Sequence, residues 1–237
     1  RAARRERLDL VHHPRHLVPP EPSLRVPSVV TVHDVLPLAE PQHFSQLILR
    51  RYELLTRTAV RGAALVLTGS RHSANEIETR LGVDPARIRV TPYGVEERFR
   101  PLPPEPGWLG ERFAIDAPYV LAVGTLEPRK NLAGAVRAFE EVHRRLPGHV
   151  LVVVGGAGWK QAELQNALGA TKAPLVRTGY VSDEELVRLY SGAGCFVFPS
   201  LSEGFGFPVL EAMACGAPVV SSDRTSLPEL VGDAGLL

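Results

Sequence analysis

The sequence predicts an α/β protein made of two domains, each built on a parallel sheet. Short apolar runs typical of strands alternate with amphipathic runs typical of helices along the whole chain. This alternation is the pattern of parallel sheets with helices on both faces. It is interrupted by the Pro- and Gly-rich stretch 100–107 and then restarts. We therefore expect a first domain at 1–98, a linker at 99–107 and a second domain at 108–237.

The composition is that of a globular protein. With 237 residues, of which 44% are hydrophobic and 22% charged, the chain can bury a sizeable core, and disordered and fibrous classes are excluded. The net charge of +1 gives no general argument for nucleic acid as a partner. Residues 1–61 hold ten Arg and five His against six Asp plus Glu. This mild basic bias suits an anionic surface, although a solvated face has the same composition.

The sequence also bears on the compartment. No apolar run is long enough to span a membrane, and no secretory signal is visible. Cys195 and Cys215 lie in apolar stretches without metal-ligand spacing, which favours buried free thiols in a reducing compartment. We therefore expect a cytoplasmic protein, with room for peripheral contact at the inner face of an anionic membrane. Because the chain opens on Arg1 and stops in an apolar stretch, we interpret it as a fragment cut at both ends, with the first domain partial and the last helices missing.

Two helices and four strands are expected in the first domain. A helix should run from about Phe44 to Arg61, and Ser70 can cap a second helix that ends near Gly82. The four apolar runs expected to form strands are Leu8–His12, Val29–His33, Ala64–Thr68 and Ile88–Thr91.

The second domain carries clearer signals. Asn131 can cap a helix with one clean apolar face, and Ser182 opens a capping box at the start of a helix that runs to about Ser191. A third helix should end at Ala214, with Gly216 as its stop. The expected strands are Tyr119–Val123, Val150–Val154, Val176–Tyr180, Cys195–Phe198 and Ala217–Ser221.

Several common motifs are absent. The run Gly155–Gly158 follows a strand but lacks the third glycine of a dinucleotide-binding turn. Neither a nucleoside-triphosphate loop of the G-x-x-x-x-G-K-[ST] type nor a G-x-S-x-G nucleophile elbow occurs. His12, His13 and His16 cluster in a Pro-rich loop with Asp9 as the nearest carboxylate, so we expect no metal site there.

Three loops with chemistry-bearing residues follow strands of the second domain, at the edge where open α/β sheets bind ligands. In Gly124–Asn131, Arg129 and Lys130 stand beside a helix N-terminus. Two cations and a helix dipole could hold a diphosphate there and stabilise it as a leaving group, although a solvated basic turn is the alternative. In Gly155–Gly158 the missing side chains would let a ring or a ribose approach the backbone, or would serve only a tight turn.

The third loop, Ser202–Glu211, places two carboxylates around a glycine turn that enters a helix. Glu203 could accept hydroxyls of a donor sugar, and Glu211 could accept both hydroxyls of a ribose. Gly204 and Gly206 would bring the backbone close to phosphates at the helix N-terminus. A sugar nucleotide offers both kinds of group, a polyol and an anion.

The run Glu-x-Phe-Gly-x-Pro-x-x-Glu at 203–211 resembles the signature of retaining glycosyltransferases of the GT-B fold, the "group 1" family. This resemblance implies two Rossmann-like domains whose parallel sheets face each other across a cleft. Further segments similar to that family are Val123–Asn131, Gly179–Ser182, Pro218–Val220, Pro228–Glu229, Thr31–Asp34 and Thr91–Val95.

The resemblance implies transfer of a sugar from a nucleotide diphosphate to an acceptor hydroxyl, with retention at the anomeric carbon and without a metal or other cofactor. The family mechanism is front-face attack, in which the departing phosphate helps to take the acceptor proton. On this reading Arg129 and Lys130 stabilise the leaving diphosphate, Glu203 holds the donor sugar and Glu211 holds the ribose.

His33 would reach from the first domain toward the transferring sugar. A histidine that ends a strand is, however, often a hydrogen-bonded structural residue, and Asp34 beside it could equally cap the following turn. The resemblance thus implies catalytic roles for His33, Arg129, Lys130 and Glu203. It implies donor contacts for Gly124, Thr125, Arg129, Lys130, Gly155, Gly156, Glu203, Gly204, Phe205, Gly206, Phe207 and Glu211.

Thr125 departs from the family pattern, because many relatives carry Arg at that position. The charge at the phosphate site must then come from Arg129 and Lys130, and which of the two touches the phosphates stays open. The segment 125–131 resembles mannosyltransferases that use GDP-mannose, while UDP- and dTDP-sugars remain alternatives. The implied acceptor is a lipid-linked or polysaccharide intermediate.

Two other functions stay open. The chain could be a non-catalytic relic that binds sugar nucleotides, or an enzyme of the same fold that uses inorganic phosphate or epimerises a nucleotide sugar. The family's first glycine-rich loop and its terminal helical segment are missing from the chain. The resemblance therefore implies that this fragment alone is not competent for catalysis.

Overall fold

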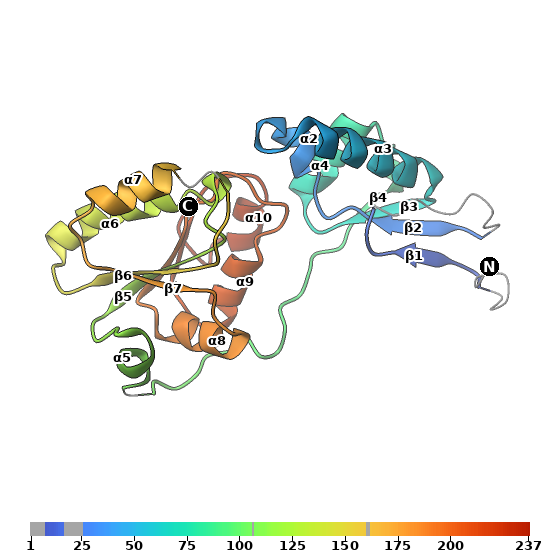
Figure 1. Cartoon of the computed structure of the whole chain (residues 1–237). Coiled ribbons are helices and arrows are strands. Elements are labelled where there is room, and N and C mark those ends of the chain that lie inside the picture. Colours follow the sequence, from blue (N-terminus) through green and yellow to red (C-terminus); the bar gives the residue numbers. More distant parts are fainter. Residues whose placement is uncertain (1–7, 17–25, 106, 160–161) are drawn as a thin grey trace. The chain divides into compact units, whose positions relative to one another are not determined.

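The computed structural model describes residues 8–16, 26–105, 107–159 and 162–237. Contacts divide the chain into two compact units, residues 1–93 with 203–205, and residues 94–202 with 206–237. Each unit contains one sheet whose neighbouring strands all run parallel (Figure 1). The predicted α/β class with two parallel sheets is therefore confirmed.

The first unit holds a four-stranded sheet in the order β1-β2-β3-β4. Its strands are β1 Val11–His13, β2 Ser28–Thr31, β3 Leu65–Thr68 and β4 Ile88–Val90. The helices described are α2 Leu36–Ala39, α3 Gln46–Gly62 and α4 Arg71–Leu81, with 3₁₀ turns η1 Pro41–His43 and η2 Pro85–Arg87. The core lies between the sheet and the helices, and its members include Val30, Val32, Ala59, Val60, Val66 and Ile77.

Local signals in the first unit predicted most of its elements. The Ser70 hydroxyl accepts a hydrogen bond from the Ser73 amide at the start of α4, and Gly82 ends that helix at a φ of 67°, so both predicted caps are confirmed. The prediction of a strand from Leu8 was wrong at its start. Strand pairing begins only at Val11, opposite Ser28 of β2, and Leu8 remains exposed.

The second unit holds a five-stranded sheet in the order β7-β6-β5-β8-β9. Its strands are β5 Tyr119–Val123, β6 Val150–Val154, β7 Leu175–Gly179, β8 Cys195–Phe198 and β9 Val219–Ser221. Its helices are α5 Trp108–Phe113, α6 Leu132–Arg145, α7 Ala162–Ala170, α8 Asp183–Gly192, α9 Phe207–Ala214 and α10 Leu227–Val231, with the 3₁₀ turn η3 Pro128–Lys130.

Helices cover both faces of this sheet. Successive side chains of its central strands point to opposite sides, so they enter two different cores. Leu121 of β5 joins the core formed with α8, α9 and α10, and Ala122 joins the core formed with α6 and α7 (Figure 1). In β6 the same alternation places Val152 in the first core and Val153 in the second. The continuous apolar runs read as buried strands are confirmed, and β5, β6 and β8 have the predicted bounds.

Helices α2, α5, α7 and α10 were not predicted. Three of them have six residues or fewer, and α7 buries only Leu164, so none offers a long apolar stripe in the sequence. The capping box of α8 is confirmed, with the Ser182 side chain accepting from the Glu185 amide and the Glu185 carboxylate accepting from the Ser182 amide.

Both cysteines are free thiols. Cys215 is buried as predicted, and burial raises the pKa of its thiol to about 11. Cys195 is only half-buried, because it lies at the start of β8 on a face that α6 covers in part. In the part of the chain that the structure describes, no helix is long and apolar enough to cross a membrane.

Candidate functional site

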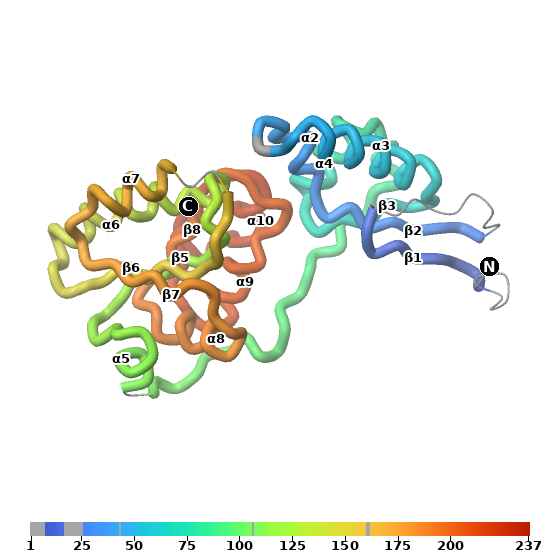
Figure 2. The backbone as a smooth tube through the Cα atoms, viewed as in Figure 1, coloured from blue at the N-terminus to red at the C-terminus, as the bar shows by residue number. Residues whose placement is uncertain are grey.

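Two of the loops singled out from the sequence, Gly124–Asn131 and Gly155–Gly158, and the segment that leads from β8 to the third, Ser202–Glu211, follow strands that are neighbours in the second sheet. In the order β6-β5-β8, strand β5 lies in the middle, so its loop adjoins the other two (Figure 2). We name Gly124–Asn131 the β5 loop, Gly155–Gly158 the β6 loop and Pro199–Ser202 the β8 loop. Because the strands are parallel, all three loops leave the same carboxyl edge of the sheet.

The β5 and β6 loops are joined main chain to main chain. The Gly124 amide donates to the Val154 carbonyl at 2.9 Å, and the Leu126 amide donates to the Gly156 carbonyl at 3.1 Å. Leu126 also forms a parallel bridge with Ala157. These bonds continue the β5–β6 ladder beyond the strands, so the two loops form an extension of the sheet.

Two of the three glycines of the β6 loop are needed for this backbone contact, and one is not. A Cβ on Gly155 would lie 2.0 Å from the Gly124 carbonyl oxygen, and Gly155 has a φ of +153°. A Cβ on Gly158 would lie 2.4 Å from the Leu126 carbonyl oxygen. Both positions therefore need glycine so that the two backbones can approach each other. A Cβ on Gly156 would meet nothing within 4 Å, so Gly156 is the glycine of the β6 loop with room for a ligand.

Arg129 is held by an ion pair inside the β5 loop. Its Nη2 lies 2.5 Å from Glu127 Oε1, and the Glu127 side chain is only 4% exposed against 21% for Arg129. The Nη1 of Arg129 also donates to the Ser202 carbonyl at 2.6 Å. The guanidinium therefore neutralises a buried carboxylate and fastens the β8 loop at the same time.

Further hydrogen bonds join the β5 and β8 loops. The Arg129 carbonyl accepts from the Leu201 amide at 2.8 Å and from the Ser200 hydroxyl at 3.2 Å. Asn131 donates through Nδ2 to the Pro199 carbonyl at 3.2 Å, while its Oδ1 caps α6 at the Gly134 amide as predicted. The β5 loop is thus bonded to both of its neighbours.

Lys130 is placed differently from Arg129. A Cβ on Gly124 would lie 3.2 Å from Lys130 Cγ and Cδ, so the lysine stem runs across Gly124. Its Nζ lies 5.0 Å from the ring centroid of Phe198, the last residue of β8. The ammonium therefore stands over the carboxyl ends of β5 and β8.

The second predicted carboxylate, Glu211, lies in the second turn of α9. Gly206 precedes this helix at a φ of 108°, a conformation that favours glycine, and Phe207 opens it with its side chain exposed. Glu211 Oε2 accepts a hydrogen bond from the Tyr190 hydroxyl of α8 at 3.1 Å. Burial raises the pKa of Glu211, and the Tyr190 hydrogen bond opposes this effect because it stabilises the ionised form.

His33 lies just after β2 in the first unit. Its Nε2 is 3.0 Å from the Pro14 carbonyl oxygen, and its Nδ1 is 2.7 Å from the Tyr93 hydroxyl. Because a carbonyl can only accept, Nε2 donates to Pro14, and Nδ1 is hydrogen-bonded to the Tyr93 hydroxyl. Both ring nitrogens are thus partnered, in line with the alternative of a hydrogen-bonded structural histidine.

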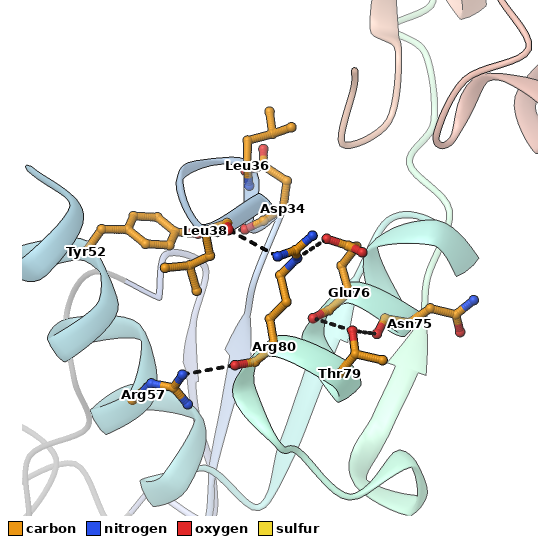
Figure 3. A network of polar contacts seen from close by, with 9 residues as sticks. All are labelled: Asp34, Leu36, Leu38, Tyr52, Arg57, Asn75, Glu76, Thr79 and Arg80. Carbon is orange, nitrogen blue, oxygen red and sulfur yellow. Dashed lines mark hydrogen bonds and ion pairs between the residues drawn. The ribbon is translucent and has the colours of Figure 1, made fainter. Parts of the chain in front are cut away.

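Asp34 caps the turn that follows β2, which is one of the two roles expected for it from the sequence. Its Oδ1 accepts from the Leu36 amide at 3.1 Å at the start of α2 (Figure 3). Its carbonyl accepts from the Tyr52 hydroxyl of α3 at 2.7 Å.

The predicted site residues therefore fall into three groups. Gly124, Thr125, Arg129, Lys130, Gly155 and Gly156 meet in the β5 and β6 loops of the second unit, and Gly206, Phe207 and Glu211 lie at the start of α9. Glu203, Gly204 and Phe205 are grouped with His33 in the first unit, and the Glu203 side chain is buried. In the described ranges, no group of three or more His, Cys, Asp or Glu side chains is arranged to hold a metal ion.

Residues 111–236, more than half of the chain, match the protein family described as "Glycosyl transferases group 1". The chain belongs to this family. Residues 1–99 match a second family, described as "Glycosyltransferase Family 4". The membership predicted from the glutamate-bearing run at 203–211 is thereby confirmed.

Two curated relatives of this group 1 chain are named as mannosyltransferases. The O-antigen chain mannosyltransferase B of Escherichia coli is 35% identical over 99% of this chain and 62% of its own length. The GDP-mannose-dependent alpha-(1-6)-phosphatidylinositol monomannoside mannosyltransferase of Mycolicibacterium smegmatis is 31% identical over 76% of this chain and 50% of its own length. The chain thus spans between half and two thirds of these relatives.

Solved structures support the same fold. Anabaena Alr3699/HepE in complex with UDP has a TM-score of 0.69 and 26% identity, covering 87% of this chain and 56% of its own. A sucrose-phosphate synthase from Thermosynechococcus elongatus has a TM-score of 0.73 and 24% identity, covering 100% of this chain and 62% of its own. The predicted GT-B class, with its two parallel-sheet units, is confirmed by these similarities.

Sequence reasoning missed two residues that govern the candidate site. Glu127 is the buried partner of Arg129, and Tyr190 is the donor to Glu211. Glu127 stands two positions before Arg129, a spacing that also fits a solvated turn. Tyr190 lies 21 positions before Glu211. Neither pairing has a local signal in the sequence, since both depend on how loops and helices pack.

We predict that Gly155→Ala destabilises the second unit while Gly156→Ala does not. The first substitution forces a side chain against the Gly124 carbonyl at a φ that favours glycine, which should cost about 2–4 kcal/mol of unfolding free energy. The second meets open space and should change stability by no more than about 0.5 kcal/mol. Urea unfolding followed by tryptophan fluorescence reports this unit, because Trp108 and Trp159 both lie in it. Equal effects of the two substitutions would contradict the packing role of Gly155.

We predict that Tyr190→Phe raises the pKa of Glu211 further above its ordinary value. The ionised carboxylate loses a hydrogen bond, so the protonated form gains relative weight. The measurement is a titration of the Glu211 carboxyl carbon by ¹³C NMR. Tyr119→Phe is the matched control, since it removes another buried tyrosine hydroxyl that donates instead to the Leu189 carbonyl. A pKa of Glu211 that is unchanged or lower in Tyr190→Phe would contradict the assignment.

Proposed function

We propose that this chain is part of a retaining glycosyltransferase that moves mannose from GDP-mannose to a hydroxyl of a lipid-linked or polysaccharide acceptor. Family membership supports the reaction class. The names of the Escherichia coli and Mycolicibacterium smegmatis relatives support mannose as the sugar, and the name of the latter supports GDP as the nucleotide. The observation that carries the proposal is the arrangement of the β5 loop, which holds Lys130 over the ends of β5 and β8.

In this proposal Lys130 is the cation that contacts the donor diphosphate. Arg129 has its charge balanced by Glu127 and one of its donors committed to Ser202, whereas the Lys130 ammonium stands over the edge where ligands bind. A lysine at that point would stabilise the negative charge that develops on the departing phosphate. Arg129 is then a positioning residue that fixes the geometry of the β5 and β8 loops.

In the same proposal Glu211 and Glu203 bind the hydroxyl groups of the donor. Glu211 would accept the ribose hydroxyls with the oxygen that Tyr190 leaves available, and Glu203 would accept hydroxyls of the sugar. Gly156 leaves room for the nucleoside. His33 is the first unit's candidate contact to the transferring sugar, and the departing phosphate would help to remove the acceptor proton.

A donor screen on the full-length protein tests the reaction class and the donor together. GDP-mannose, UDP-glucose and a dTDP-sugar are each incubated with an extract of lipid-linked and polysaccharide glycans, and the released nucleoside diphosphate is measured. We expect GDP release that depends on the extract. Release of UDP or dTDP instead would show that GDP-mannose is not the donor. UDP release would agree with the similarity to the UDP complex of HepE. Tight binding of a nucleotide sugar without release of its nucleoside diphosphate would indicate a non-catalytic protein that only binds the donor. Conversion of the donor sugar to another sugar in the absence of acceptor would indicate an epimerase.

We predict that Lys130→Ala and Arg129→Ala fail in different ways. Loss of one charge-assisted contact to phosphate should weaken binding of GDP-mannose and GDP roughly 10- to 100-fold, with little change in thermal stability. Arg129→Ala leaves Glu127 buried without its partner and should cost about 3 kcal/mol or more of unfolding free energy. Calorimetric titration and thermal unfolding measure the two effects.

Lys172→Ala is the matched control for Lys130→Ala, because Lys172 is an exposed lysine of the same unit. It should leave both donor affinity and stability unchanged. Normal donor affinity in Lys130→Ala would remove Lys130 from the phosphate site.

A further inference from the structure

The segment 95–102, which precedes α5, packs against the second unit along its length. Phe99 lies at the start of the linker expected from the sequence, yet its side chain is only 9% exposed and joins the core formed with α8, α9 and α10. Val95 and Leu102 pack against the same core. Connecting segments usually run over the surface with their side chains in solvent. This segment is instead a part of the second unit with a defined place.

Two polar contacts fasten the segment to both ends of α8. The Nη1 of Arg98 lies 2.7 Å from Oδ2 of Asp183, the first residue of the helix. The Leu102 amide donates to the Ser191 hydroxyl at 3.1 Å, close to the end of the helix. Arg98 also pairs with Glu96 of the segment itself at 2.5 Å. Because exposed ion pairs contribute little stability, these contacts mainly define where the segment lies along α8.

Between these two contacts Phe99 meets the ring of Tyr190, a residue of α8. The ring centroids are 6.3 Å apart with an angle of 62° between the planes, an edge-to-face arrangement. Phe196 of β8 also lies edge-to-face with the Tyr190 ring, at 5.4 Å and 85°. Tyr190 is completely buried, so its ring is held by neighbouring side chains and not by solvent. Packing against Phe99 and Phe196 therefore determines where the tyrosine hydroxyl lies.

The place of this hydroxyl matters because it donates to Glu211 of α9. The oxygen atoms of Tyr190 and Glu211 are 3.1 Å apart, whereas hydrogen bonds between two oxygens are most often about 2.7–2.8 Å long. A bond that is already long is lost after a small further displacement of its donor. The contact between Phe99 and the tyrosine ring thus bears directly on the bond to Glu211.

We propose that Phe99 is a positioning residue of the donor site, which holds Tyr190 at hydrogen-bonding distance from Glu211. Phe99 acts through the tyrosine on the carboxylate assigned to the ribose, so the segment 95–102 belongs to the donor site although it lies apart from the β5, β6 and β8 loops. The role of Glu211 rests on the proposed function. The series of contacts from Phe99 through Tyr190 to Glu211 is a property of the folded unit alone.

A residue that only fills the core would behave differently from a positioning residue. If Phe99 only fills space, its replacement has the same effect whether or not residue 190 carries a hydroxyl. If Phe99 positions the hydroxyl, its replacement no longer affects Glu211 once that hydroxyl has been removed. A double-mutant cycle between Phe99 and Tyr190 separates these two cases.

The test compares Phe99→Leu, Tyr190→Phe and the double variant in the full-length protein. Leucine keeps an apolar side chain in the core but removes the ring edge that meets Tyr190. We expect Phe99→Leu to raise the pKa of Glu211 in a ¹³C NMR titration, because a weaker hydrogen bond stabilises the ionised form less. Calorimetric binding of GDP-mannose and of GDP should weaken roughly 3- to 10-fold. In the Tyr190→Phe background, Phe99→Leu should change neither quantity further.

Phe139→Leu is the matched control, because Phe139 is a buried phenylalanine in the other core of the same unit. It should lower the melting temperature as Phe99→Leu does, while the pKa of Glu211 and the donor affinity stay as in the parent. Phe99→Met fills more of the space and repeats the measurement if Phe99→Leu does not fold. An unchanged pKa of Glu211 in the folded Phe99 variants, or an equal loss of affinity with and without the Tyr190 hydroxyl, would overturn the proposal.

Failure of the proposed function would give a different result. The parent would then bind neither GDP-mannose nor GDP, while Phe99→Leu would still raise the pKa of Glu211. That outcome removes the donor assignment and supports the positioning of Glu211 by Phe99 through Tyr190.

Discussion

The second unit depends on the close approach of two backbones, at Gly124 and Gly155. The glycine at 155 lets the β5 and β6 loops meet at hydrogen-bonding distance, and a side chain there would push them apart. With the β5 loop fixed on that side, its other side can hold the β8 loop through the main chain and side chain of Arg129. Loops after three adjacent strands are thereby locked into one surface, and Lys130 is carried on it.

The charged residues of this surface have two kinds of role, one in holding the loops together and one in the proposed binding of the donor. Glu127 and Arg129 form a neutral pair next to the β8 loop, and such a pair contributes mainly by defining one geometry. Lys130 lies over an aromatic ring, a contact that leaves an ammonium able to meet an anion. Glu211 accepts a hydrogen bond from a neutral donor, Tyr190, and this contact does not neutralise its carboxylate. The neighbouring cations Arg129 and Lys130 thus have different roles, the first in fixing the loops and the second in the proposed contact with an anion.

Much of this architecture could be predicted from local patterns. Val150–Val154 is a continuous apolar run bounded by glycines, and Ser182 begins a capping box, so the strand and the helix were both placed correctly. The choice between Arg129 and Lys130 could not be predicted, because it depends on Glu127 being buried and on a carbonyl more than seventy positions away. Likewise the β6-loop glycines appear equivalent in the sequence, and only the position of the β5 backbone distinguishes Gly155 from Gly156.

The continuous ladder between the β5 and β6 loops also has a consequence for motion. The amides of Gly124 and Leu126 can exchange with solvent only when the two loops separate, and that separation breaks bonds that continue those of the central strands. This part of the edge should therefore open as rarely as the sheet itself, on the slow timescale of hydrogen exchange. A ligand arriving there meets a surface that is already ordered, so little conformational entropy is lost from these loops on binding.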